Sequence, residues 1–78
     1  MATMERKQQA VLRCLNTLIR ARGYSPTVAA LAQYIGKSRN ATMFQLNRLV
    51  DRGYVKHEYG ERQDWSLTPE GLRVVVAV

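Results

Sequence analysis

Apolar residues recur with the period of an α-helix along the first part of the chain. In the first stretch their spacing places them on one face of a helix, and these positions are Val11, Cys14, Leu15, Leu18 and Ile19. We predict a helix over residues 4–22, ended by Gly23, since glycine readily adopts the left-handed conformation that closes helices. Residues 24–26 then form an extended link, because the residue before a proline avoids helical angles. Tyr24 is expected to lay its ring on the core between the helices.

Two shorter helical stretches follow, joined by a glycine turn. The first covers residues 28–35 between the N-cap Thr27 and Gly36, and its apolar face comprises Val28, Leu31, Ala32 and Ile35. Ser38 is the N-cap of the second helix, over residues 39–52, whose buried stripe comprises Thr42, Leu46, Leu49 and Val50. The second helix therefore begins almost at once, at an angle to the first. This pattern is typical of the helix-turn-helix unit, whose second helix is usually presented to the DNA major groove.

After Gly53 the period of apolar positions changes from 3.6 to 2, as in strands. Alternating residues on either side of a polar tip at residues 60–64 predict two antiparallel strands, the wing, over residues 54–68. An isolated hairpin is marginally stable, so its apolar face, chiefly Val55 and Leu67, is expected to pack on the helices. Tyr59 and Trp65 are expected to be cross-strand partners near the tip.

The C-terminal segment, residues 69–78, begins with helix-start signals and ends in an apolar run. Thr68, Pro69 and Glu70 fit a cap, a first-turn proline and a first-turn acid, while the valines that follow suit either a strand or a longer helix. We expect this apolar end to lie on the core or in a subunit interface. Residues 1–78 then form one α+β, mostly helical domain with three helices, a two-stranded wing and a short C-terminal helix or strand: a winged helix-turn-helix.

The charge of the chain is strongly basic and unevenly distributed. The net charge is +6 and the isoelectric point is near 10.1. Residues 1–57 hold ten Lys or Arg against two acidic residues, whereas residues 58–78 hold two against four. A basic surface also serves solubility, but basicity concentrated on a helix-turn-helix pattern favours a nucleic-acid partner.

The buried stripe of the second helix determines which of its side chains face outward. The side opposite Leu46 carries Asn40, Phe44, Asn47 and Arg48. Arg39 has the geometry to read guanine and Asn40 to read adenine, and Gln45 is a second candidate base reader on the flank. We expect Ser38, Lys37 and Arg48 to contact phosphates, which position a protein on DNA without specifying sequence.

Two further residues have alternative interpretations. Phe44 is a large apolar residue on the outward face, which suits either contact with a thymine methyl group or a protein interface. Arg62, at the hairpin tip, suits the minor groove or its phosphates, although Glu61 and Asp64 weaken the attraction. A merely solvated arginine is the other interpretation.

Other classes of function find little support in the sequence. Cys14 is interpreted as core packing rather than a redox thiol, and His57 as structural or solvent-facing because no other residue stands at ligand spacing. We expect no metal, no cofactor and no enzymatic activity, since no nucleophile and base stand at a recognisable spacing. Without a membrane span or a signal-peptide pattern, we expect a cytoplasmic protein.

Two segments resemble known DNA-binding families. Residues 20–55, RARGYSPTVAALAQYIGKSRNATMFQLNRLVDRGYV, resemble the DNA-binding domain of LexA-type repressors, with its Gly-Tyr-x-Pro-Thr link and its Lys/Arg-Gly-hydrophobic exit. Residues 65–75, WSLTPEGLRVV, are similar to the wing exit of MarR-like regulators, where Leu-Thr-x-x-Gly follows the second strand. The 78 residues show no resemblance to the self-cleaving protease domain of full-length LexA, so we do not expect self-cleavage from this resemblance.

The combined pattern predicts sequence-specific binding to double-stranded DNA. We expect a small transcriptional regulator, a repressor, that acts as a homodimer with the second helix of the unit in the major groove. The apolar C-terminus and the first helix are the expected dimer surfaces. The alternative function is a protein-protein interaction module that docks through Phe44 and the wing.

Overall fold

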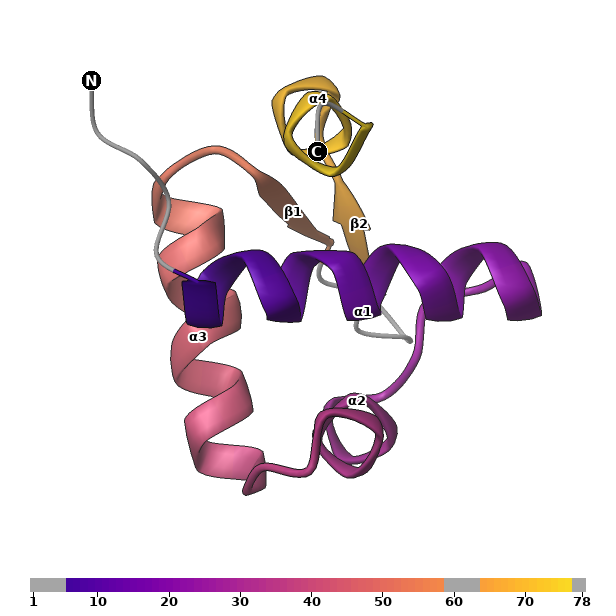
Figure 1. Ribbon diagram of the computed structural model, residues 1–78, viewed down its shortest axis with the longest axis vertical. Helices are drawn as coiled ribbons and strands as arrows, with labels where there is room; N and C mark the ends of the chain where they lie inside the picture. Colours follow the sequence, from indigo (N-terminus) through magenta and orange to yellow (C-terminus); the bar gives the residue numbers. More distant parts are fainter. Residues whose placement is uncertain (1–5, 59–63, 77–78) are drawn as a thin grey trace.

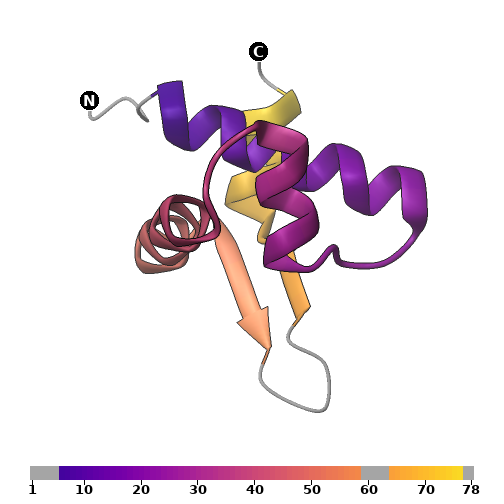
Figure 2. The same cartoon turned by 90° about the horizontal axis from the view of Figure 1, so that it is seen from below.

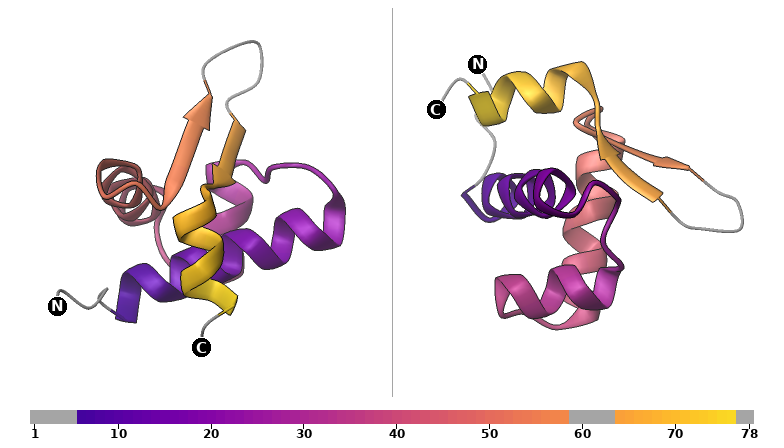
Figure 3. Two further views of the ribbon diagram at one scale, coloured as in Figure 1. Left: turned by 90° about the horizontal axis from the view of Figure 1, so that it is seen from above. Right: turned by 90° about the vertical axis from the view of Figure 1, so that its right-hand side faces the viewer.

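One long helix, α1, lies at the centre of the fold and is contacted by the other helices. The computed structural model describes residues 6–58 and 64–76, and it contains α1 (Arg6–Arg22), α2 (Val28–Ile35), α3 (Arg39–Asp51), β1 (Val55–Glu58), β2 (Asp64–Leu67) and α4 (Pro69–Val76). Helix α1 lies between α2 and α4, α3 packs across α1 and α2, and the two strands project from the helices (Figures 1, 2 and 3). This arrangement confirms the predicted winged helix-turn-helix fold.

Caps with short polar side chains define the helix-turn-helix unit. The Thr27 hydroxyl oxygen accepts a hydrogen bond from the Ala30 amide at 3.0 Å, and that of Ser38 accepts one from the Ala41 amide at 3.1 Å. Between them Gly36 adopts a left-handed φ of 83° and donates its amide to the Ala32 carbonyl. The chain therefore leaves α2 and enters α3 within three residues, which sets the angle between the two helices.

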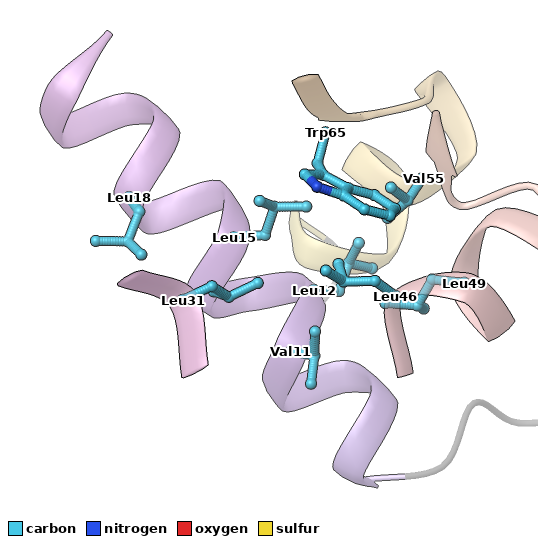
Figure 4. Close-up of a cluster of buried hydrophobic side chains, with 9 residues drawn as sticks. All are labelled: Val11, Leu12, Leu15, Leu18, Leu31, Leu46, Leu49, Val55 and Trp65. Carbon is cyan, nitrogen blue, oxygen red and sulfur yellow. The ribbon is translucent and has the colours of Figure 1, made fainter. Parts of the chain in front are cut away.

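The hydrophobic core gathers around α1 (Figure 4). Its fully buried members come from several elements and are Val11, Leu12, Leu15, Leu18, Leu31, Leu46, Leu49, Val55 and Trp65. The expected face of α1 was too narrow, because Leu12 and Gln8 are also buried, each with 0% exposure. Since α1 packs against α2, α3, α4 and β2, it is covered over more of its circumference than one stripe.

The hairpin register corrects the expected aromatic pair. Trp65 lies opposite His57, not Tyr59, which is outside the described residues. Trp65 is only 2% exposed, and His57 stacks on it with ring centroids 3.8 Å apart. The expected apolar face was therefore incomplete, since Trp65 joins Val55 in the core while Leu67 is half-buried.

The wing is attached to the link between α1 and α2. The Trp65 amide donates a hydrogen bond to the Ser25 hydroxyl oxygen at 2.8 Å, across 40 residues of sequence. Pro26 is the buried residue of this link, whereas Tyr24 is 56% exposed. The expectation that Tyr24 lies on the core is therefore wrong, because the inward side of the link is occupied by Pro26 and by Ser25 bonded to Trp65.

The C-terminal segment is helical, which decides between the two structures expected for it. The Thr68 hydroxyl donates to the Gly53 carbonyl at 2.6 Å and accepts from the Gly71 amide at 3.1 Å, so one side chain caps α4 and ties it to the end of α3. Val74 and Val75 pack against the core, while the opposite side of α4 is exposed.

Candidate nucleic-acid interface

The outward side of α3 is a surface that the other described elements leave open. Helix α3 packs on α1, α2 and β1 through its Thr42, Leu46 and Leu49 face, and Figure 1 shows it at one side of the molecule. Met43 and Val50 are half-buried and also pack against the core. We call the exposed and half-buried side chains outside that contact the α3 outer face; they are Lys37, Ser38, Arg39, Asn40, Phe44, Gln45, Asn47 and Arg48.

The N-terminal end of the α3 outer face is fully exposed and basic. Lys37, Ser38, Arg39 and Asn40 are all exposed. The Ser38 oxygen is already occupied as the helix cap, and the Ser38 carbonyl accepts the Thr42 hydroxyl at 2.9 Å. These bonds fix the position of the helix start, where free backbone N–H groups and the dipole favour an anion.

The centre of the α3 outer face carries an aromatic ring covered by a cation. Phe44 is 57% exposed, and the guanidinium carbon of half-buried Arg48 lies 5.6 Å from the centre of its ring. This distance is within the range of a cation–π interaction, which for an exposed pair contributes roughly 0.5–1 kcal/mol. The two residues, one helical turn apart, therefore form a single structural pair on the surface.

Gln45 sits differently from the other candidate readers. The residue is half-buried, and its Oε1 atom is buried with no hydrogen-bond partner in the part of the chain that the structure describes. Reading adenine needs both the oxygen and the amide NH₂ of glutamine at the base edge. In this orientation the oxygen is turned away from solvent, so the amide must rotate before it can read a base.

Positive charge near α3 is not neutralised within the described part of the protein. Among the described residues the salt bridge joins Lys56 Nζ to Glu58 Oε1 on β1, 2.9 Å apart, with both side chains about 60% exposed. Hydrogen bonding in this pair raises the pKa of Lys56 and lowers the pKa of Glu58. In residues 6–58 and 64–76, Lys37 and Arg39 have no such partner, so their charges are available to an acidic ligand.

The remaining candidates lie elsewhere or outside the described residues. Arg62 is among the residues that the structure does not describe. Tyr34, 55% exposed on α2, is an outward aromatic residue that the sequence reasoning missed. Its signal was its place just off the apolar face of residues 28, 31, 32 and 35.

The described part of the chain offers little for other kinds of site. No group of three or more His, Cys, Asp or Glu gathers there as metal ligands would. No helix in the same residues is long and apolar enough to cross a membrane. A shallow pocket of about 240 Å³ lies beside Ile19, Ser25 and Trp65, below the usual size of a ligand pocket. Cys14 packs against the core, and burial raises the pKa of its thiol, which disfavours the reactive thiolate.

Two solved structures have a fold similar to that of this chain. A mutant of MepR from S. aureus superposes with a TM-score of 0.80 at 17% sequence identity, over 95% of this chain and 55% of that one, and it shows likeness of fold alone. Wild-type ZitR of Lactococcus lactis, in complex with DNA, has a TM-score of 0.76 at 25% identity, over 96% of this chain and 50% of that one.

The sequence comparisons agree on one family. A LexA repressor of Limosilactobacillus fermentum (strain NBRC 3956 / LMG 18251) is 36% identical over 70 residues, which are 88% of this chain and 34% of that protein. The chain thus spans about a third of the length of the curated relatives it matches. Residues 1–62 match the family model of the LexA DNA binding domain. Because this match covers most of the chain, the protein belongs to the LexA DNA binding domain family.

Proposed function

We propose that this protein binds double-stranded DNA with sequence specificity and acts as a transcriptional repressor, with α3 in the major groove. The observation that carries the proposal is the α3 outer face, an exposed and basic helix surface presented by a helix-turn-helix unit. Family membership, the DNA complex of ZitR and the name of the LexA repressors support it. The role is one of binding rather than catalysis.

Seven residues at and within α3, and one residue of the wing, have a proposed role. Arg39 and Asn40 read base edges, since both are exposed at the end of the helix that usually meets the bases. Lys37, Ser38 and Arg48 hold phosphates and so position the helix. Gln45 reads a base after rotation of its amide, and Phe44 faces the DNA. Arg62 of the wing contacts the minor groove or its phosphates.

We propose that the protein acts as a homodimer on a partly palindromic site. Helix-turn-helix dimers place two recognition helices about one DNA turn apart, so the symmetry of the site mirrors that of the protein. Leu72 and Val76 of α4 are exposed by 45% and 80%. They lie four residues apart and therefore on one side of the helix, which suits a contact with a second copy.

A selection from random duplex DNA tests the proposed function. We expect enrichment of a palindromic motif, and we expect affinity for it to fall with salt by roughly 0.9 log units per log unit of salt for each phosphate neutralised. Enrichment of no motif, with salt-dependent binding, would reduce the function to non-specific DNA binding. If the protein binds no DNA at moderate salt concentration, the proposal is contradicted and a protein partner is favoured.

The first prediction concerns Arg39. Arg39→Ala should weaken binding to the selected site by about 1–3 kcal/mol and relax specificity at one base pair, because alanine cannot make the bidentate hydrogen bonds to guanine. The matched control is Arg20→Ala, an exposed arginine in the last turn of α1, which should keep the wild-type affinity and specificity. Equal losses of affinity by Arg39→Ala on all sequences would instead identify Arg39 as a phosphate contact.

A further inference from the structure

Phe44 is a large apolar residue that lies on the surface of α3. Its ring is 57% exposed in the middle of the α3 outer face, although an apolar side chain is normally turned toward the core. The core side of α3 is already filled by Thr42, Leu46 and Leu49, each no more than 1% exposed. Phe44 is therefore not part of the core of the described structure, and its ring is available for an external contact.

The surroundings of Phe44 indicate the chemistry of that contact. One helical turn before it stands Asn40, and three and four residues after it stand Asn47 and Arg48, which lie beside it on the helix surface. Arginine and aromatic residues also occur at protein-protein interfaces, so the guanidinium over the ring does not by itself identify the partner. The exposed Lys37, Arg39 and Asn40 on the same surface favour DNA, because lysine is depleted at protein interfaces and basic and amide groups suit phosphates and base edges. An apolar ring among amide and cationic groups matches the edge of a base pair next to a phosphate.

Among the four bases, thymine alone presents an apolar group, its C5 methyl, in the major groove. We propose that Phe44 determines specificity by packing its exposed ring against the C5 methyl of one thymine in the bound site. Arg48, stacked on the same ring, is held by it in position for a neighbouring phosphate. This inference rests on the DNA-binding function proposed above and gives Phe44 a base to read.

The experiment replaces each thymine of the selected site, one at a time, with deoxyuridine, which removes only the C5 methyl. For the wild-type protein we expect about a fourfold loss of affinity at one thymine, the effect of removing one methyl-sized apolar group from the interface. Phe44→Ala should bind the thymine and deoxyuridine versions of that position equally. Phe44 is exposed, so the variant is expected to fold, and circular dichroism checks that it does.

The matched control is Tyr34→Ala, which removes an equally exposed aromatic ring from α2. This variant should keep the full wild-type sensitivity to deoxyuridine. The inference is overturned if the wild type is indifferent to every deoxyuridine, or if Phe44→Ala remains sensitive at the same position. In both cases a selected motif would leave the DNA-binding function standing. Absence of salt-dependent DNA binding would refute that function, and the inference with it.

A second measurement tests the positioning of Arg48. Phe44→Leu keeps an apolar side chain against the methyl group but removes the aromatic face on which the guanidinium rests. In the wild-type background, we expect Arg48→Gln to reduce the slope of log affinity against log salt concentration by about 0.9 for each phosphate that Arg48 neutralises. The flattening should be smaller in the Phe44→Leu background. Equal flattening in both backgrounds would show that the ring does not position Arg48.

Discussion

The buried amide of Gln8 opposes the stability of the fold. The side chain is 0% exposed on α1, and neither its Nε2 nor its Oε1 atom has a hydrogen-bond partner among residues 6–58 and 64–76. We predict that Gln8→Met stabilises the protein by about 1–3 kcal/mol, because a methionine of similar shape removes the cost of burying unpaired polar atoms. Urea denaturation measures the change.

The control for this prediction is Gln33→Met, at an exposed position on α2. Surface substitutions of this kind change stability by no more than about 0.5 kcal/mol. A destabilised Gln8→Met protein with an unchanged Gln33→Met protein would show that the Gln8 amide is satisfied in solution.

Single residues show where sequence reasoning works and where it stops. The caps Thr27 and Ser38 were predicted because a cap depends on the three residues that follow it. The burial of Gln8 and the exposure of Tyr24 were not predicted, since both depend on which distant elements cover these residues. For Phe44 the outward position was predicted from the helix period, but its stacking with Arg48 depends on side-chain rotamers.

At the scale of elements, α4 depends on a close approach of backbones at Gly71. A Cβ atom added there would overlap the carbonyl oxygen of Tyr54. Alanine usually stabilises a helix by roughly 1 kcal/mol over glycine. Here we predict that Gly71→Ala destabilises the protein by about 1–3 kcal/mol, as overpacking does, measured by thermal denaturation.

Val76→Ala, on the exposed side of the same helix, serves as the reference and should melt close to the wild type. A rise in the melting temperature of Gly71→Ala would mean that α4 does not lie against Tyr54. The same contact explains the Leu-Thr-x-x-Gly segment, in which Thr68 caps α4 and bonds to Gly53 while Gly71 admits the neighbouring backbone.

Elements were predicted well where their signals are local. The expected helix at residues 28–35 coincides with α2, and α3 ends one residue before its expected limit. The hairpin was recognised from its period of 2. The expected cross-strand partner of Trp65 was wrong, because the strand register, which places His57 there, depends on the opposite strand and its packing. The choice between helix and strand after Thr68 stayed open in sequence, since β-branched valines suit both until the capping bonds are seen.

At the scale of the whole molecule, the basic α3 outer face and the exposed apolar residues of α4 lie on different helices. The α3 outer face is basic and polar, with Phe44 as its apolar exception, whereas Leu72 and Val76 expose apolar surface on α4. Helix α1 lies between α4 and α2 (Figure 3), and Leu72 and Val76 are exposed on α4. A second copy docked on α4 would therefore leave both α3 outer faces free for DNA, as a dimeric regulator requires.

This separation predicts that dimerisation can be removed without unfolding the protein. The double variant Leu72→Glu/Val76→Glu should sediment as a monomer and bind a palindromic site at least about tenfold more weakly, because two half-sites no longer act together. Circular dichroism should show that it remains folded, since these side chains lie outside the buried core. Its melting temperature should lose only the contribution of the dimer and should no longer depend on protein concentration. Gln33→Glu, an acidic substitution at an exposed position on α2, controls for the added negative charge.

A wild-type protein that sediments as a monomer at high concentration would contradict the dimer. A double variant that still sediments as a dimer would show that the interface is on another surface, with α1 the next candidate.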